Sequence, residues 1–236
     1  MYKIVKKTMT GKAHIKNGTE CQDKIALYDS EGTFAVALAD GAGSREDSGL
    51  LADAITKDIS YFIAKEFDIL YKNEKIKDIL YDRIINIVKS FSDKGYDVAC
   101  TLLVVAVKDS RFLSIHVGDG IIIGANSEKT QVVSEPENGN DLSETYMCEP
   151  LMDDEHIRIV EEKLKYDTLI LTSDGIEPSL WNRSSGEIAD AVPVMRKWML
   201  ECSVNQVEAL VEDAMKNVFT ANTNDDMSLS IINCIR

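Results

Sequence analysis

The sequence contains few cysteines and few prolines. It has five cysteines, an odd number with no Cys-x-x-Cys spacing, and four prolines in 236 residues. This cysteine usage argues against a disulfide framework and against a zinc site built on paired thiolates. With few prolines and no low-complexity tract, the chain has the composition of a soluble globular protein. We expect the cysteines to be reduced, small buried side chains.

Long apolar runs are also missing. No stretch approaches the roughly 20 residues that a membrane-spanning helix needs. The first residues, MYKIVKKTMTGK, lack the apolar core of a secretory signal. We therefore expect a cytoplasmic protein with no membrane partner.

Positive charge is scarce. Lys and Arg number 26 against 40 Asp and Glu, and the formal net charge is −14. Such a field repels nucleic acids and anionic membranes, so neither is expected as the main partner. A phosphorylated substrate would be repelled as well, unless bound metal reverses the sign of the charge locally.

The apolar patterns predict strands and helices that do not alternate regularly. Strands are expected at 3–8, 23–28, 33–40, 98–107, 112–120, 121–125, 156–162, 167–175 and 227–235, with 112–120 and 121–125 forming a hairpin. Helices are expected from Ser48, over 76–91, after a capping box at 184–187, and from Ser203. Residues 134–150 are polar and are expected to form a loop. This order predicts one α+β domain over 1–236, in which helix pairs pack outside antiparallel sheet.

Four aspartates stand where apolar strands meet turns. Asp40, Asp119 and Asp174 follow strands and each precedes a glycine, whereas Asp225 comes just before the last strand. Strands that share a core can bring these carboxylates to one edge, provided that the last strand runs antiparallel to the other three. Crowded carboxylates need cations, and oxygen ligands without a His/Cys cluster favour Mg²⁺ or Mn²⁺.

The order of the motifs is more specific than any single Asp-Gly, which by itself is typical of a turn. From about Gly11 to Ile232 the chain resembles, segment for segment, the metal-dependent protein phosphatases of type 2C. Residues 135–145 are similar to a bacterial branch of that family, with Ser143 where an asparagine is usual. The segments that carry the resemblance are CQD (21–23), ADGAGS (39–44), ACTLLVVAV (99–107), VGDG (117–120), LILTSDG (169–175) and NDDMSLSII (224–232).

The resemblance implies a fold, a ligand set and an activity. The fold is a four-layer α/β/β/α sandwich of two antiparallel sheets flanked by helix pairs. Asp40 would bridge two Mg²⁺ or Mn²⁺ ions, the Gly41 carbonyl would bind the second, Asp174 and Asp225 would bind the first, and Asp119 would hold a third, weaker ion. The implied reaction is hydrolysis of phosphoserine or phosphothreonine in a protein substrate. A cognate kinase or its targets would be further partners.

The catalytic groups around the metals are less determined. Asp23 matches an acid that holds metal-bound water. The family's phosphate-binding arginine lies five residues before it, where this chain has Gly18, and Arg45 is a candidate substitute or a solvated side chain. The family's histidine acid follows the first Asp-Gly, where this chain has Ala42. His14 could protonate the leaving oxygen or serve only a local hydrogen bond.

Two further assignments depend on strand register. Successive strand residues face opposite ways, so Asp226 is the alternative to Asp225 as a metal ligand, and the family pattern favours Asp225. His116 alternates with apolar neighbours in a strand and is expected to be structural.

Two other functions compete with phosphatase activity. A catalytically weak or silent relative could bind phosphoproteins as a regulatory module, and the departures at Gly18 and Ala42 leave that alternative open. A calcium-binding structural role is disfavoured, because no D-x-[DN]-x-[DN]-G loop is present.

Overall fold

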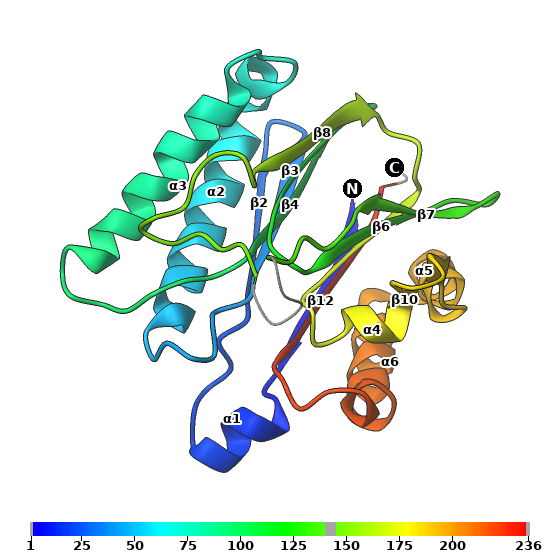
Figure 1. Ribbon diagram of the computed structural model, residues 1–236. Coiled ribbons are helices and arrows are strands. Elements are labelled where there is room, and N and C mark those ends of the chain that lie inside the picture. Colours follow the sequence, from blue (N-terminus) through cyan, green and yellow to red (C-terminus); the bar gives the residue numbers. More distant parts are fainter. Residues whose placement is uncertain (1, 140–144, 235–236) are drawn as a thin grey trace. The chain divides into compact units, whose positions relative to one another are not determined.

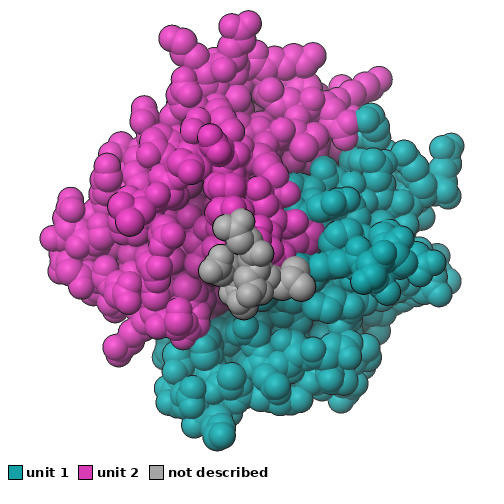
Figure 2. Space-filling model, viewed as in Figure 1, with its two compact units in different colours: residues 1–21, 120–135, 165–236 teal, residues 22–119, 136–164 magenta. Residues whose placement is uncertain are grey.

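The chain folds into two compact units. The computed structural model describes residues 2–139 and 145–234. Unit 1 contains 1–21, 120–135 and 165–236, and unit 2 contains 22–119 and 136–164 (Figure 2). Each unit has one five-stranded antiparallel sheet and a helix pair, which confirms the predicted α+β class. The single domain expected over 1–236 stays a prediction.

Unit 2 is a sheet covered by two long helices. The strand order is β2-β3-β4-β5-β8, and α2 packs on β2, β3 and β4 with α3 beside it (Figure 1). The elements are β2 (Lys24–Ser30), β3 (Thr33–Ala39), α2 (Ser48–Leu70), α3 (Ile76–Ser92), β4 (Leu102–Lys108), β5 (Arg111–Val117) and β8 (Arg158–Lys163).

The apolar patterns explain this packing. All seven residues of β3 are buried, as its continuous apolar run predicts. On α2, one stripe of fully buried side chains faces the sheet: Leu51, Ile55, Ile59 and Ile63. Each such side chain contributes on the order of 1.5–3 kcal/mol to folding by leaving water.

Unit 1 has its own sheet and core. The strand order is β1-β12-β9-β6-β7, with α6 packed on β1 and α5 on β12 and β6. Its larger elements are β1 (Lys3–Met9), β6 (Ile121–Ala125), β7 (Thr130–Ser134), β9 (Thr168–Thr172), α5 (Ala191–Glu201), α6 (Val204–Asn217) and β12 (Met227–Asn233). The shorter ones are α1 (Lys12–Asn17), α4 (Glu177–Leu180), β10 (Trp181–Asn182), β11 (Glu187–Ile188) and the 3₁₀ turn η1 (Phe219–Ala221).

Two local predictions are wrong and one is confirmed. Strands β5 and β6 do not form a hairpin, because β5 pairs with β4 and β8 whereas β6 pairs with β7 and β9. Residues 184–187 are not a capping box, since they form the turn and first residue of the β10–β11 hairpin. The capping box at the start of α6 is present, with Ser203 and Gln206 bonded reciprocally.

The sequence analysis also missed short elements. It did not predict α1, α4 or β7. Within the part of the chain that is described, no helix is long and apolar enough to cross a membrane.

Candidate functional site

Unit 2 brings three of the predicted acids to one edge of its sheet. Strand β2 begins just after Asp23 and β3 ends just before Asp40, and Lys24 pairs with Ala39 across the two strands. Asp23, before the start of β2, and Asp40, after the end of β3, therefore lie at the same end of two neighbouring strands. Because β3 and β5 both run antiparallel to β4, Asp119, which comes two residues after β5, lies at the same edge.

The backbone at Asp40 is held on both sides. Its N–H donates to Thr101 Oγ1 at 3.0 Å, and its carbonyl accepts from the Thr101 N–H at 2.8 Å. Gly41 forms an antiparallel bridge to Cys100. A Cβ at Gly41 would lie 3.0 Å from both Gln22 Cβ and the Ser48 carbonyl carbon, so this close approach suits glycine. The predicted Gly41 ligand thus lies on a fixed segment.

Asp119 is tied to the polar segment that was predicted as a loop. The Thr145 hydroxyl donates to Asp119 Oδ2 at 2.5 Å, and the Glu137 N–H donates to the Gly118 carbonyl at 2.9 Å. Asn138 and Thr145 form an antiparallel bridge. The described ends of segment 134–150 are therefore anchored beside Asp119. Ser143 lies outside the described residues.

A second set of contacts braces the same segment. Glu137 bonds His156 Nδ1 and pairs with Arg158, both at 3.0 Å. The ring of Tyr146 stacks on that of His156, with centroids 3.3 Å apart and planes 12° apart. His156 is thus part of the anchorage of segment 134–150.

Unit 1 brings the remaining two acids to one edge of its own sheet. Strands β9 and β12 are antiparallel, and Leu229 pairs with Thr172. Asp174 lies two residues beyond the end of β9, and Asp225 lies two residues before the start of β12. The last strand therefore has, relative to β9, the direction that the sequence required.

The two neighbouring acids of this edge have different environments. Asp226 is 1% exposed, and its carboxylate accepts from the Gly11 N–H at 2.7 Å and bonds His14 Nδ1 at 2.8 Å. Asp225 is exposed, and its Oδ1 accepts from the Asp226 N–H at 2.9 Å. Asp226 is therefore a buried side chain that is hydrogen-bonded within unit 1. Asp225 as a metal ligand stays a prediction, with which its exposure agrees.

Of the two candidate substitutes for family residues, each has a local partner. His14 is buried on α1 and bonded to Asp226, so the local hydrogen bond that we considered is present. Arg45 pairs with Glu149 at 2.7 Å and donates to the Val98 carbonyl at 3.0 Å. Its guanidinium therefore braces unit 2 and is not a merely solvated side chain.

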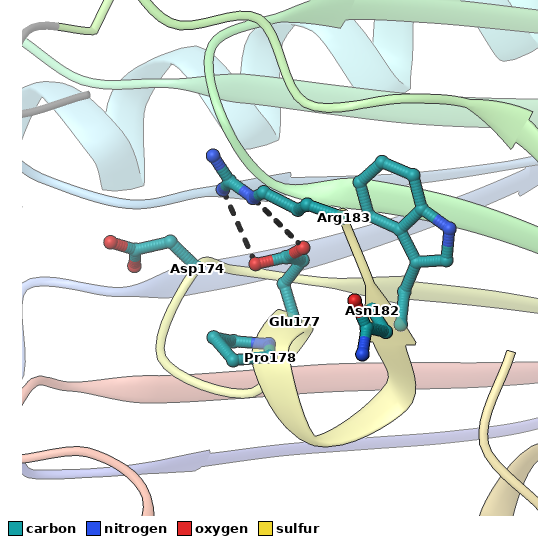
Figure 3. Close-up of a pocket in the computed structure, with 6 residues that line it drawn as sticks. Asp174, Glu177, Pro178, Asn182 and Arg183 are labelled. Carbon is teal, nitrogen blue, oxygen red and sulfur yellow. Dashed lines mark hydrogen bonds and ion pairs between the residues drawn. The ribbon is translucent and has the colours of Figure 1, made fainter. Parts of the chain in front are cut away.

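A pocket beside Asp174 contains an ion pair that the sequence analysis missed. The pocket has a volume of about 380 Å³ and is lined by Asp174, Glu177, Pro178, Trp181, Asn182 and Arg183 (Figure 3). The Glu177 side chain is 1% exposed. Arg183 donates to its two oxygens from Nε at 3.1 Å and Nη2 at 3.2 Å. Glu177 lies on α4 and Arg183 in the turn after β10, and no pattern in the sequence joins them.

Two buried groups near the edge of unit 2 are poor candidates for chemistry. Burial, and then the charge of Arg158, hold the pKa of His116 well below its usual range. Burial, with smaller contributions from Cys148 and Asp40, raises the pKa of the Cys100 thiol. Both groups are thus kept neutral, which agrees with the structural role expected for His116.

The predicted ligands are divided between the units. Unit 2 carries Asp40, Gly41 and Asp119, and unit 1 carries Asp174 and Asp225. All are carboxylates or a backbone carbonyl, the donors that Mg²⁺ and Mn²⁺ prefer, and none of the four carboxylates is buried. Within residues 2–139 and 145–234, no three His, Cys, Asp or Glu side chains cluster closely enough to hold an ion.

Several solved bacterial phosphatases have a fold similar to that of this chain. A bacterial serine phosphatase matches with a TM-score of 0.70 at 14% identity, covering 100% of this chain and 98% of that chain. The serine/threonine phosphatase Stp1 of Staphylococcus aureus matches with a TM-score of 0.69 at 14% identity, covering 100% of this chain and 96% of the other. The S. agalactiae serine/threonine phosphatase gives 0.67 at 13% identity, with 99% of each chain covered. At these identities the matches establish the fold.

The family is established by the sequence. No curated protein matches the chain significantly. The model of the family described as protein phosphatase 2C matches residues 10–218, which is most of the chain. The chain therefore belongs to the protein phosphatase 2C family and is a phosphoprotein phosphatase by class.

Proposed function

We propose that this protein is a Mg²⁺- or Mn²⁺-dependent phosphatase of phosphoserine and phosphothreonine in cytoplasmic proteins. One observation carries the proposal. In each unit the predicted acids stand at one edge of the sheet, Asp23, Asp40 and Asp119 in unit 2 and Asp174 and Asp225 in unit 1. Two divalent cations held by such groups, with a third held more weakly, would lower the pKa of a water molecule towards neutrality and neutralise phosphoryl oxygens.

Each residue has a distinct role in this proposal. Asp40, whose backbone is held by Thr101, would be a ligand of both cations. Asp23 accepts a hydrogen bond from the attacking water. The water oxygen forms the new bond to phosphorus as the bond to the serine or threonine oxygen breaks, one proton of the water passes by way of Asp23 to solvent, and no phosphoenzyme forms. His14, held through Nδ1 by Asp226, gives the departing oxygen its proton from Nε2.

A direct experiment tests the activity. Purified protein is expected to release phosphate from a phosphothreonine peptide in Mn²⁺ or Mg²⁺ and to stop in EDTA. Equal rates with and without EDTA would reject the metal-dependent mechanism. Binding of the phosphopeptide without turnover would instead support the silent regulatory module.

Segment 134–150 is proposed to select the protein substrate. Its described ends are anchored beside Asp119, and loops held by a rigid scaffold often carry recognition. The phosphorylated targets of a cognate serine/threonine kinase are the expected substrates. Shortening the segment should lower activity on a phosphoprotein and spare a small aryl phosphate. An equal loss on both substrates would assign the segment to the reaction centre.

A further inference from the structure

A second pocket of unit 1 adjoins the pocket beside Asp174. This hairpin pocket has a volume of about 490 Å³ and forms where α4, the β10–β11 hairpin and the start of α5 meet (Figure 1). The two pockets share three lining residues, Pro178, Trp181 and Asn182. A peptide segment that is bound beside Asp174 can therefore continue into the hairpin pocket.

The apolar wall of the hairpin pocket is held in place by the fold. Trp181 pairs with Ile188 across the hairpin, and both side chains pack against the core of unit 1. The Asn182 side chain accepts from the N–H groups of Ser184 and Ser185, which fixes the turn between the two strands. The pocket is thus formed before a ligand binds.

The hairpin pocket also carries two carboxylates. Glu187 on β11 and Asp190 before α5 are both exposed, and the lining residues include no Lys, Arg or His. Asp190 takes the N-cap position of α5, yet its side chain does not cap the helix as an N-cap aspartate usually does. Glu187 accepts a bond from the Ser185 hydroxyl at 3.1 Å. In the described part of the chain neither carboxylate forms an ion pair, so both can receive a cation.

A long basic side chain fits this combination of groups. The stems of Lys and Arg cover apolar surface while their charged ends stay near water. Among aromatic rings, indole attracts a cation most strongly, and the guanidinium of Arg also stacks on it. A divalent ion would lack ligands, because no three His, Cys, Asp or Glu side chains cluster closely enough to hold one in the residues that the structure describes.

We propose that the hairpin pocket binds an arginine or lysine side chain of the protein substrate, with Glu187 and Asp190 as its charged partners and Trp181 as its apolar wall. This inference rests on the proposed function and narrows its substrates to phosphoproteins with a basic residue near the phosphorylated one. Adjacent pockets of this size have centres roughly 10 Å apart, which an extended peptide spans in about three residues. The competing explanation is that both carboxylates are only solvated.

The test compares phosphothreonine peptides in Mn²⁺. A reference peptide has alanine at the four positions on each side of the phosphothreonine, and each further peptide replaces one alanine with arginine. At least one arginine should lower KM by about 5- to 30-fold with little change in kcat, an effect of the size expected from an exposed cation–π contact and two exposed ion pairs. Citrulline, which has the shape of arginine without its charge, should lose this gain at the same position.

The variant E187Q/D190N removes both charges and keeps the shapes of the side chains. It should abolish the arginine preference and leave KM for the reference peptide and for an aryl phosphate unchanged. The matched control is E208Q/D213N, which removes two exposed charges from α6 outside the pocket and should keep the full preference. An equal loss of preference in both variants would reflect net charge alone and would overturn the inference.

A binding measurement makes the test independent of turnover. Labelled peptides with a phosphonate in place of the phosphate, whose P–C bond is not hydrolysed, are titrated in Mn²⁺ and followed by fluorescence anisotropy. A wild type that binds the arginine and alanine peptides equally, or an E187Q/D190N variant that keeps the preference, would overturn the inference. Metal-dependent turnover without an arginine preference would reject this inference alone. Arginine-dependent binding that E187Q/D190N abolishes, without turnover, would reject only the proposed function.

Discussion

The two units prepare their strand-end acids in different ways. In unit 2, Asp40 follows the end of β3, is only partly buried, and has its backbone fixed by Thr101 and by the Gly41–Cys100 bridge, whereas Asp23, just before β2, is 1% exposed. In unit 1, one of two successive acids, Asp226, is used internally by His14 and Gly11. The same position at the end of a strand thus gives either an accessible carboxylate or a structural one.

Burial and partners decide between these roles. A carboxylate that accepts two protein donors in a buried place stabilises its own unit, and a charged ligand there would have to displace them. A carboxylate at an accessible edge of a sheet can still bind a cation. The following experiments would break or sharpen this contrast between the units.

The largest expected effect is loss of a proposed ligand from either unit. Asp40→Asn and Asp174→Asn should each lower kcat/KM by more than the roughly 10- to 100-fold typical of residues that only support a metal ligand. Both substitutions keep the side-chain shape, so circular dichroism should be unchanged. A loss of less than about tenfold in only one of the two variants would mean that only the other unit supplies the metal centre.

The next effect is a stability change that differs between the units. A Cβ at Gly11 would lie 2.2 Å from the Asp225 carbonyl carbon. Gly11→Ala should therefore destabilise unit 1 by about 1–3 kcal/mol and weaken Mn²⁺ binding by shifting Asp225. In unit 2, Gly49→Ala on α2 meets Gln22 at an ordinary 3.4 Å and should be neutral or stabilising by up to about 1 kcal/mol. Urea denaturation and metal titration check both, and equal destabilisation would refute the contrast.

A smaller effect is expected within unit 2. Asp119→Asn touches the weaker ion and the bond from Thr145, so it should change the metal dependence of the rate more than tight metal binding. Thr145→Val should give part of this change, because it removes only the hydroxyl. Calorimetric Mn²⁺ titration provides the comparison with Asp40→Asn. Weaker tight binding in Asp119→Asn than in Asp40→Asn would reverse the two roles.

The smallest effect concerns surface charge in unit 1. Hydrogen bonds from Lys216 and Lys7 lower the pKa of Glu212 from 4.5 to about 2. A lowered folded-state pKa adds stability above pH 4.5, and this stability is lost as the pH falls from 4.5 towards 2. Glu212→Gln should therefore flatten the acid limb of the stability curve in that window, weakly because the pair is exposed. A mutant curve parallel to that of the wild type below pH 4.5 would contradict this assignment.

The positions of most acids at the strand ends could be predicted from the sequence, because these positions depend on local patterns. A continuous apolar run that ends in Asp-Gly specifies both a buried strand and an accessible acid, as at Asp40 and Asp174. The opposite direction of the last strand follows from Asp225 preceding its run. The family pattern favoured Asp225 over Asp226, which strand register alone does not determine; the burial of Asp226 agrees with this choice, which stays a prediction.

The failures come from strand pairing between distant segments and from elements too short to carry a sequence pattern. Residues 112–125 have the pattern of a hairpin, yet Gly118, with φ of 109°, turns the chain so that β6 joins another sheet. The pattern of alternating apolar residues identifies strands but not their sheet. Glu177 and Arg183 meet through a short helix and a two-residue ladder, elements too short to give a periodic signal.

The bridge between Asn138 and Thr145 makes the segment between them a natural site for protein engineering. Its described flanks are held by contacts with Gly118, Asp119 and Glu137. Doubling the length of such a closed loop costs only about 0.6 kcal/mol in chain entropy. Under the proposed role of segment 134–150 in substrate selection, grafting segments of different length and composition between these two positions should redirect the activity to other phosphoproteins, with the sheet of unit 2 serving as a constant frame.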